Sequence, residues 1–196
     1  MVSILHVNSS ARMTGSASRL GGDMVVEHLR ARYSNVVVVE REAVAQAAFL
    51  SEEWIGASFT HIDDRSAEQD EILATSNALA QEVLNADILV LGVAMYNFGL
   101  SSAMKAWIDH VARPGITFRP DPEHTYVGLA TGKKAYIVLA SGETSAGSEM
   151  DFATPYLKHV LEFLGIRDVQ VIGADLTVTS PGTLEDRIKA QVAQLT

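Results

Sequence analysis

The sequence predicts an α/β fold: a five-stranded parallel sheet with helices on both faces. Short apolar runs rich in β-branched residues alternate with longer segments that carry apolar residues at helical spacing, and this alternation is typical of parallel sheets. The chain has 196 residues, of which 47% are hydrophobic and 20% charged. That length and composition suit one globular domain with its own core, which we expect to span residues 1–196.

The predicted strands are four- or five-residue runs dominated by Val, Ile, Leu and Ala. Runs of this length and composition, separated by polar or helical segments, are typical of strands in an α/β sheet. In chain order they are residues 4–7, 36–39, 88–91, 135–139 and 169–172.

In the segments between these runs, apolar residues recur at the spacing of an α-helix. In residues 18–33, for example, Leu20, Met24, Val25 and Leu29 recur at the spacing of one helix face. The same spacing predicts helices over residues 68–84, 100–111, 154–164 and 183–195.

Two connections, residues 42–66 and 112–133, are longer than the two to six residues usual in α/β units. Both contain aromatic residues, so we expect ordered walls of a pocket or an interface there. These aromatic residues are Phe49, Trp54 and Phe59 in the first connection, and Phe118 and Tyr126 in the second.

Charge and composition exclude several classes of function. A net charge of −9 and a pI near 5.0 argue against nucleic acid or an anionic membrane as the main partner. There is no cysteine, so any redox chemistry must come from a cofactor, and the six histidines lack metal-ligand spacing. With no leader-like start and no apolar run long enough to span a membrane, we expect a soluble, cytoplasmic protein without a metal.

The loop after the first predicted strand is a candidate phosphate site. Residues 9–18 contain five hydroxyl side chains and lead directly into a helix, whose first N–H groups attract anions. Neither the Gly-x-Gly-x-x-Gly nor the P-loop pattern is present, so a mononucleotide phosphate is favoured over a dinucleotide or P-loop nucleotide. The simpler alternative is that Ser16 or Ser18 only caps the helix.

Two more loops follow the third and fourth predicted strands. Residues 95–99 read Met-Tyr-Asn-Phe-Gly, an unusually aromatic connection, and residues 141–147 are rich in Gly, Ser and Thr. We expect the strand order 2-1-3-4-5, a common order of doubly wound parallel sheets, in which both loops neighbour the phosphate loop at the switch point where such sheets bind ligands. A phosphate beside a flat ring predicts FMN. The alternatives are core packing for residues 95–98 and an ordinary turn at residues 141–142.

These motifs resemble those of the FMN-dependent NADH:quinone/azo oxidoreductases, the AzoR-type azoreductases, which have a flavodoxin-like fold. The resemblance covers nearly the whole chain, and the Met-Tyr-Asn-Phe run with the downstream Gly-x-Thr-Phe-Arg is its most specific part. The matching residues are Ser9-Ser10 with Ser16 to Ser18, Met95 to Phe98 with Ser101, Lys105 and Asp109, Gly115 to Arg119, Gly128 to Lys134, Thr154 to Leu157, and Phe163 to Ile166.

The resemblance implies a homodimer that holds one FMN per subunit, with each active site borrowing residues from the other subunit. It implies that Ser10, Ser16, Ala17 and Ser18 bind the phosphate. The implied ring contacts are Met95, Tyr96, Asn97 and Phe98 on one side and Ser141, Gly142, Glu143 and Thr144 at the polar edge. The expected substrate pocket consists of Phe98, Phe118, Tyr126 and Phe163.

The implied activity is two-electron ping-pong transfer of hydride from NADH, through the N5 atom of FMN, to quinones and azo compounds, so no catalytic acid or base is nominated. Glu149 and Asp151 are interpreted as solvated residues or helix caps. Two positions depart from the family: Pro120 replaces an aromatic, for which Tyr126 could substitute, and Glu143 favours NADH over NADPH. The alternative functions are a flavodoxin-type electron carrier or flavin sensor without turnover, and a flavin-free relative.

Overall fold

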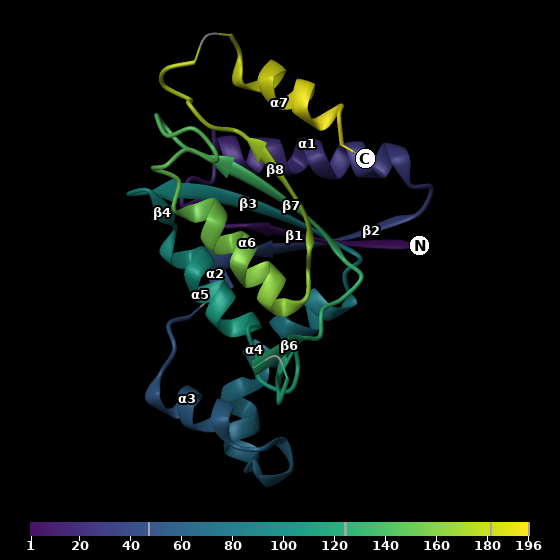
Figure 1. Cartoon of the computed structure of the whole chain (residues 1–196), viewed down its shortest axis with the longest axis vertical. Coiled ribbons are helices and arrows are strands. Elements are labelled where there is room, and N and C mark those ends of the chain that lie inside the picture. Colours follow the sequence, from purple (N-terminus) through teal and green to yellow (C-terminus); the bar gives the residue numbers. More distant parts are fainter. Residues whose placement is uncertain (47, 124, 181, 196) are drawn as a thin grey trace.

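The computed structural model confirms the predicted sheet. It describes residues 1–46, 48–123, 125–180 and 182–195. Five parallel strands lie in the order β2-β1-β3-β7-β8, which is the predicted order 2-1-3-4-5 counted along the chain (Figure 1). They are β1 (Val2–Asn8), β2 (Val36–Glu42), β3 (Ile88–Tyr96), β7 (Lys134–Ala140) and β8 (Asp168–Gly173).

The strand register brings three loops to one edge of the sheet. Asn8, the last residue of β1, pairs with Gly92 in β3 and with Glu42 at the end of β2, while Ala140 at the end of β7 pairs with Ala94. The loops that follow β1, β3 and β7 therefore emerge side by side at this carboxyl edge, the usual ligand site of open α/β sheets.

Helices cover both faces of the sheet, as predicted (Figure 1). Leu89 and Leu91 pack into one apolar layer, and the alternate residues Ile88 and Val90 pack into the other. A central strand buried on both faces has no polar side, which explains its unbroken apolar sequence. The first layer contains α4 (Ala67–Asn85), α5 (Ser102–Val111) and α6 (Ala153–Leu164), and the second contains α1 (Ala17–Arg32) and α7 (Leu184–Val192).

The helix predicted over residues 100–111 begins instead at Ser102, where the Ser101 hydroxyl caps it. Before it, Gly99–Leu100 forms a short strand, β4, that turns back antiparallel on the end of β3. Asn97 and Phe98 form the turn, with φ angles of 49° and 68°. Two successive positive φ angles are what a two-residue hairpin turn needs, so residues 95–99 form a hairpin instead of running directly into a helix.

The two long connections contain secondary structure of their own. The first forms α2 (Ala43–Gln46), α3 (Glu52–Phe59) and the short 3-10 helix η1 (Ile62–Asp64). The second forms the antiparallel hairpin β5 (Phe118–Asp121) and β6 (Thr125–Gly128). Figure 1 shows α3 and this hairpin below the ends of α5 and α6. The prediction of ordered segments there is confirmed for the described residues.

Candidate active site

The loop after β1 places hydroxyl groups at the start of α1. Ser10 and Ser18 are buried, and the Ser16 hydroxyl accepts a hydrogen bond from the Arg19 backbone N–H at 3.4 Å. Ser16 therefore caps the helix, as the simpler alternative predicts. Its hydroxyl oxygen also lies 3.2 Å from that of Ser18, so two hydroxyl groups stand together at the helix end.

The start of α1 is suited to an anion. Within the part of the chain that the structure describes, the backbone N–H groups of Ala17 and Ser18 have no protein acceptor, as is usual for the first turn of a helix. The first turn holds no acidic residue, and no atom lies within 4 Å of the place a Cβ would take at Gly15. Free amides, hydroxyls and the helix dipole fit a phosphate group there.

The hairpin turn after β3 projects aromatic side chains at the carboxyl edge. Tyr96 is 42% exposed and Phe98 is 47% exposed, whereas Met95 packs against the core. The alternative that residues 95–98 pack into the core therefore applies to Met95, and not to the exposed Tyr96 and Phe98. A bulky residue such as Phe98 with a positive φ is strained, and strained backbone of this kind clusters at functional sites.

The third loop, after β7, is held in place from two sides. The Ser141 hydroxyl donates to the Thr144 carbonyl, and the Ser141 carbonyl accepts from the Thr177 hydroxyl at 3.0 Å. Gly142 is open, with only the Val178 side chain near the place a Cβ would take, and Glu143 is exposed. The segment is thus a turn, as the simpler alternative predicts, and its open backbone still allows a flat ligand to approach.

Hydrogen bonds join these loops to one another. The Ala11 backbone N–H in the first loop donates to the Tyr96 hydroxyl at 3.2 Å, and the Ser101 hydroxyl donates to the Ser9 carbonyl at 3.0 Å. The Phe98 carbonyl accepts from the Phe152 N–H at 3.1 Å. The predicted phosphate loop and the predicted ring loop therefore form one connected surface.

Asp151 organises the third loop, a role that the sequence did not reveal. Its carboxylate is buried and accepts from the N–H groups of Gly147, Ala153 and Thr154 at 2.8 to 3.0 Å. Burial by itself would raise the pKa of Asp151, but these hydrogen bonds hold it below its ordinary value. The interpretation of Asp151 as a solvated residue is wrong, and the alternative of a helix cap is confirmed at the start of α6.

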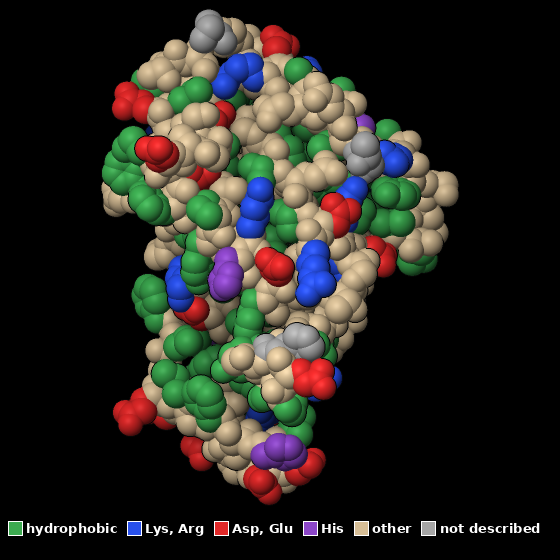
Figure 2. All heavy atoms as spheres, in the orientation of Figure 1, with side chains coloured by type: hydrophobic (Ala, Val, Ile, Leu, Met, Phe, Trp, Pro, Cys, Tyr) green, Lys and Arg blue, Asp and Glu red, His purple; other side chains and the backbone are tan. Residues whose placement is uncertain are grey.

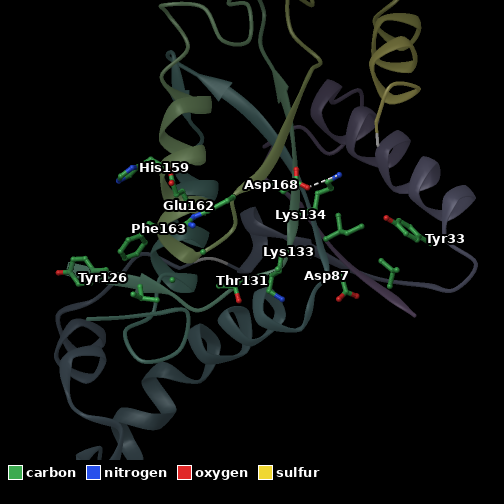
Figure 3. Close-up of a pocket in the computed structure, with 17 residues that line it drawn as sticks. Tyr33, Asp87, Tyr126, Thr131, Lys133, Lys134, His159, Glu162, Phe163 and Asp168 are labelled. Atoms are coloured by element: carbon green, nitrogen blue, oxygen red, sulfur yellow. Dashed lines mark ion pairs between the residues drawn. The ribbon is translucent and has the colours of Figure 1, made fainter. Parts of the chain in front are cut away.

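Three of the four predicted substrate-pocket residues lie together. The ring centroids of Phe118 and Phe163 are 4.6 Å apart, and that of Tyr126 lies 5.7 Å from each. Figure 3 shows Tyr126 and Phe163 side by side, one from β6 and one from α6. Phe98 is not among them, because it sits on the hairpin turn at the carboxyl edge. In this single chain the predicted pocket is therefore divided between two places.

An apolar cavity of about 910 Å³ adjoins the aromatic cluster. It lies between α3, η1, the β5–β6 hairpin and the end of α5, and Trp54, Phe59, Phe118, Tyr126 and Phe163 are among its lining residues. This placement supports the expectation that both long connections supply pocket walls. No residue of the three loops at the carboxyl edge is among the residues that line this cavity.

A buried polar group supports the wall of this cavity. Arg113 is fully buried, stacks 5.4 Å from the Trp54 ring centroid and donates to the Asn77 side chain at 2.9 Å. Burial, together with the charge of nearby Arg65, lowers the pKa of Arg113 to about 10. The Trp54 indole N–H donates to the Ser76 hydroxyl at 3.0 Å. These contacts attach α3 to α4 and to the segment that follows α5, and no sequence pattern predicted them.

A second hollow, about 1040 Å³ in volume, lies at the opposite edge of the sheet (Figure 3). Its lysines are engaged within the protein: the Lys133 amine donates to the carbonyls of Leu84 and Ala86 at 2.7 and 2.6 Å, and Lys134 pairs with Asp168. Burial lowers the pKa of Lys133. The hollow is remote from the three loops, and its lysines have structural partners.

The described residues contain no group of three or more His, Asp or Glu side chains placed to hold a metal ion. His124 lies outside them. Across residues 1–46, 48–123, 125–180 and 182–195, no helix combines the length and the apolar character that a membrane span requires.

The family model described as "Flavodoxin-like fold" matches residues 2–196. A similar protein is the FMN-dependent NADH:quinone oxidoreductase of Thiobacillus denitrificans, 48% identical over 172 residues, which cover 88% of this chain and 83% of that one. FMN-dependent NADH:quinone oxidoreductase 1 of a Jannaschia species is 42% identical over 195 residues, covering 100% and 99%.

Two solved structures share the fold at lower identity. An azoreductase from Bacillus anthracis str. Sterne has a TM-score of 0.86 at 22% identity, with 99% of this chain and 96% of that chain covered. An FMN-dependent NADH-azoreductase from Bacillus anthracis str. Ames Ancestor in complex with FMN has a TM-score of 0.85 at 20% identity, with 98% and 96% covered.

Proposed function

Because this chain belongs to the flavodoxin-like family, with relatives 42 to 48% identical that are FMN-dependent NADH:quinone oxidoreductases, we propose that it is an enzyme of that activity. It uses FMN to carry electrons from NADH to quinones and azo compounds. One observation carries the proposal: three loops meet at the carboxyl edge, where hydroxyls and free amides fit a phosphate and the adjoining hairpin presents aromatic surface.

We assign the FMN phosphate to Ser10, Ser16, Ala17 and Ser18. Two free N–H groups and a pair of hydroxyls 3.2 Å apart support this assignment. A dianionic phosphate in a chain with a net charge of −9 needs such local donors, because the overall field of the protein opposes it.

We place the ring of FMN between the turn after β3 and the loop after β7. Met95, Tyr96, Asn97 and Phe98 supply apolar surface and backbone donors, and residues 141–144 (Ser141, Gly142, Glu143 and Thr144) supply the polar edge. When bound there, FMN provides the chemistry by accepting hydride from NADH and passing two electrons to the acceptor. The protein binds and orients, so no side chain needs to act as an acid or base.

The divided pocket supports a homodimeric enzyme. Phe98 lies at one subunit's carboxyl edge, while the cluster of Phe118, Tyr126 and Phe163 belongs to a cavity elsewhere on the subunit. Hydrophobic side chains gather on the lower part of the molecule in Figure 2, and Phe59, which lines that cavity, is 80% exposed. An apolar surface of this kind marks an interaction site. We propose that a second subunit brings its cluster over the ring, completing the acceptor pocket.

Two residues bear on the choice of substrate. Exposed Glu143 offers no cation for a 2′-phosphate, which is consistent with NADH as donor. Pro120 pairs with Tyr126 across the β5–β6 hairpin and both line the cavity, which supports the proposal that Tyr126 replaces the aromatic that the family has at position 120. Use of NADH, an intracellular electron donor, supports a cytoplasmic location.

Anaerobic titration of the purified, FMN-loaded protein with NADH tests the proposal. We expect NADH to bleach the flavin absorbance stoichiometrically and menadione or an azo dye to restore it, with steady turnover in the absence of any other protein. A flavin that NADH does not reduce, or that is reoxidised only by a protein partner, would favour the electron carrier. A protein that stays colourless after FMN addition would contradict both functions.

A further inference from the structure

Arg19 lies in the first turn of α1, and its guanidinium is hydrogen-bonded to the phosphate loop, which we define as residues 9–16. Its Nε donates to the Arg12 carbonyl at 3.0 Å, and one terminal nitrogen donates to the Ser10 carbonyl at 3.1 Å. The two terminal nitrogens also donate to both carboxylate oxygens of Glu42 at 2.5 and 2.6 Å. The Arg19 side chain is only 13% exposed, so its guanidinium is largely shielded from solvent.

Arg19 is not a free cation for an anionic ligand. The hydrogen bond with Glu42 raises the pKa of Arg19, and the paired carboxylate neutralises its charge. Glu42 is the last residue of β2 and pairs with Asn8 at the end of β1, so the ion pair is anchored on the sheet itself. What Arg19 contributes to the loop is therefore the placement of two carbonyl groups.

Placing a carbonyl also places the next N–H group. In a planar trans peptide the two point in opposite directions, so a Ser10 carbonyl turned toward Arg19 turns the Ala11 N–H away from it. The Ala11 N–H does point across to the ring loop, where it donates to the Tyr96 hydroxyl. The bond to the Arg12 carbonyl orients the N–H of Met13 in the same manner.

We propose that Arg19 is a positioning residue for FMN, which keeps the phosphate loop arranged with the Ser10 and Arg12 carbonyls toward α1 and the Met13 N–H toward the phosphate. The proposal rests on the function proposed above. It assigns to Arg19 no direct contact with FMN, and it makes the Arg19–Glu42 pair a determinant of affinity for the phosphate far more than for the ring.

Titration of the apoprotein with FMN and with riboflavin, followed by flavin fluorescence, tests the proposal because riboflavin has the ring without the phosphate. We expect Arg19→Met to weaken FMN binding by roughly tenfold to a hundredfold, the scale of losing hydrogen bonds from a charged group. Riboflavin affinity should change by less than about threefold. Arg30→Met is the matched control, because Arg30 pairs with Glu27 on the exposed surface of the same helix.

Arg19→Lys separates geometry from charge, and it carries the test should Arg19→Met fail to fold. Lysine can neutralise Glu42 but lacks the planar fork that reaches two carbonyls, so we expect most of the FMN defect to persist. Equal loss of FMN and riboflavin affinity in the Arg19 variants, or normal FMN affinity in Arg19→Lys, would overturn the proposal. A wild-type apoprotein that binds neither flavin would instead defeat the proposed function, on which it rests.

Discussion

Substitution of Phe98 distinguishes the backbone strain of the hairpin turn from the contribution of the Phe98 ring to stability and turnover. The φ angle of 68° places Phe98 in the left-handed region, which costs a residue other than glycine about 1–2 kcal/mol. Glycine removes that strain but loses about 0.5–1 kcal/mol in chain entropy. Losing a ring that is 47% exposed removes about 1 kcal/mol of apolar burial. We therefore expect Phe98→Gly to unfold with a free energy within about 1 kcal/mol of the wild type.

Phe98→Ala is the informative comparison. Alanine loses the same ring but keeps a Cβ in the left-handed conformation, so it should be about 1 kcal/mol less stable than the glycine variant, the reverse of the order found in helices. Both variants lose the aromatic wall beside the flavin, and kcat/KM with menadione should fall by roughly tenfold or more. Urea unfolding of the apoprotein, followed by circular dichroism, and NADH oxidation by the holoenzyme measure the two effects.

An alanine variant as stable as the glycine variant would refute the assignment of strain to position 98, and full turnover in both would remove Phe98 from the acceptor pocket. Thr125→Gly is a matched control, because Thr125 also has a positive φ, of 62°, at the start of β6. It should gain stability without any change in FMN affinity.

Three further predictions concern the phosphate site, the third loop and the interface. The double variant Ser16→Ala with Ser18→Ala should bind FMN roughly tenfold more weakly in a fluorescence titration, because two hydroxyl donors are lost. Asp151→Asn should lower the free energy of unfolding by about 1–3 kcal/mol at pH 7. Since the pKa of Asp151 is held below 3.8, its contribution is complete above pH 3.8 and disappears as the pH falls through the lower folded-state value. If the proposed dimer forms through this surface, Phe59→Asp should yield monomers in sedimentation experiments, with FMN bound and turnover lost, whereas Val37→Asp on β2 should leave the dimer intact.

Each of these has an outcome that contradicts it. Ser66→Ala removes a comparable helix cap on α4 and should reduce stability by about 1 kcal/mol without affecting FMN, so an equal FMN defect there would contradict the phosphate assignment. For Asp151→Asn, a stability difference that stays constant from pH 7 to pH 3 would show that the carboxylate charge is unimportant. A fully active monomer of Phe59→Asp would exclude a shared acceptor pocket.

Local patterns were sufficient for the sheet and for the three loops. The buried strands carry apolar runs that no helix period explains, and Ser16, Ser66 and Ser101 cap helices in the manner their residue type favours. The hairpin at residues 97–98 was missed, because Asn-Phe is not a usual sequence for a turn that needs two positive φ angles. The burial of Asp151 and its bond to the third loop were missed, because they depend on that loop folding back over the start of α6.

The sequence by itself determined the α/β class, the strands and the three loops that we assign to FMN, since hydrophobic periodicity, hydroxyl clusters and aromatic residues act over a few neighbouring positions. The strand order came from the flavodoxin-like fold that the sequence resembles. Only the tertiary structure decided which distant groups meet. It joined Arg19 to Glu42 and the Ala11 amide to the Tyr96 hydroxyl. It also separated Phe98 from the other aromatic residues of the predicted pocket. Such contacts depend on the register of strands and on helix packing, which place residues far apart in the chain within hydrogen-bond distance and leave no mark on either local sequence.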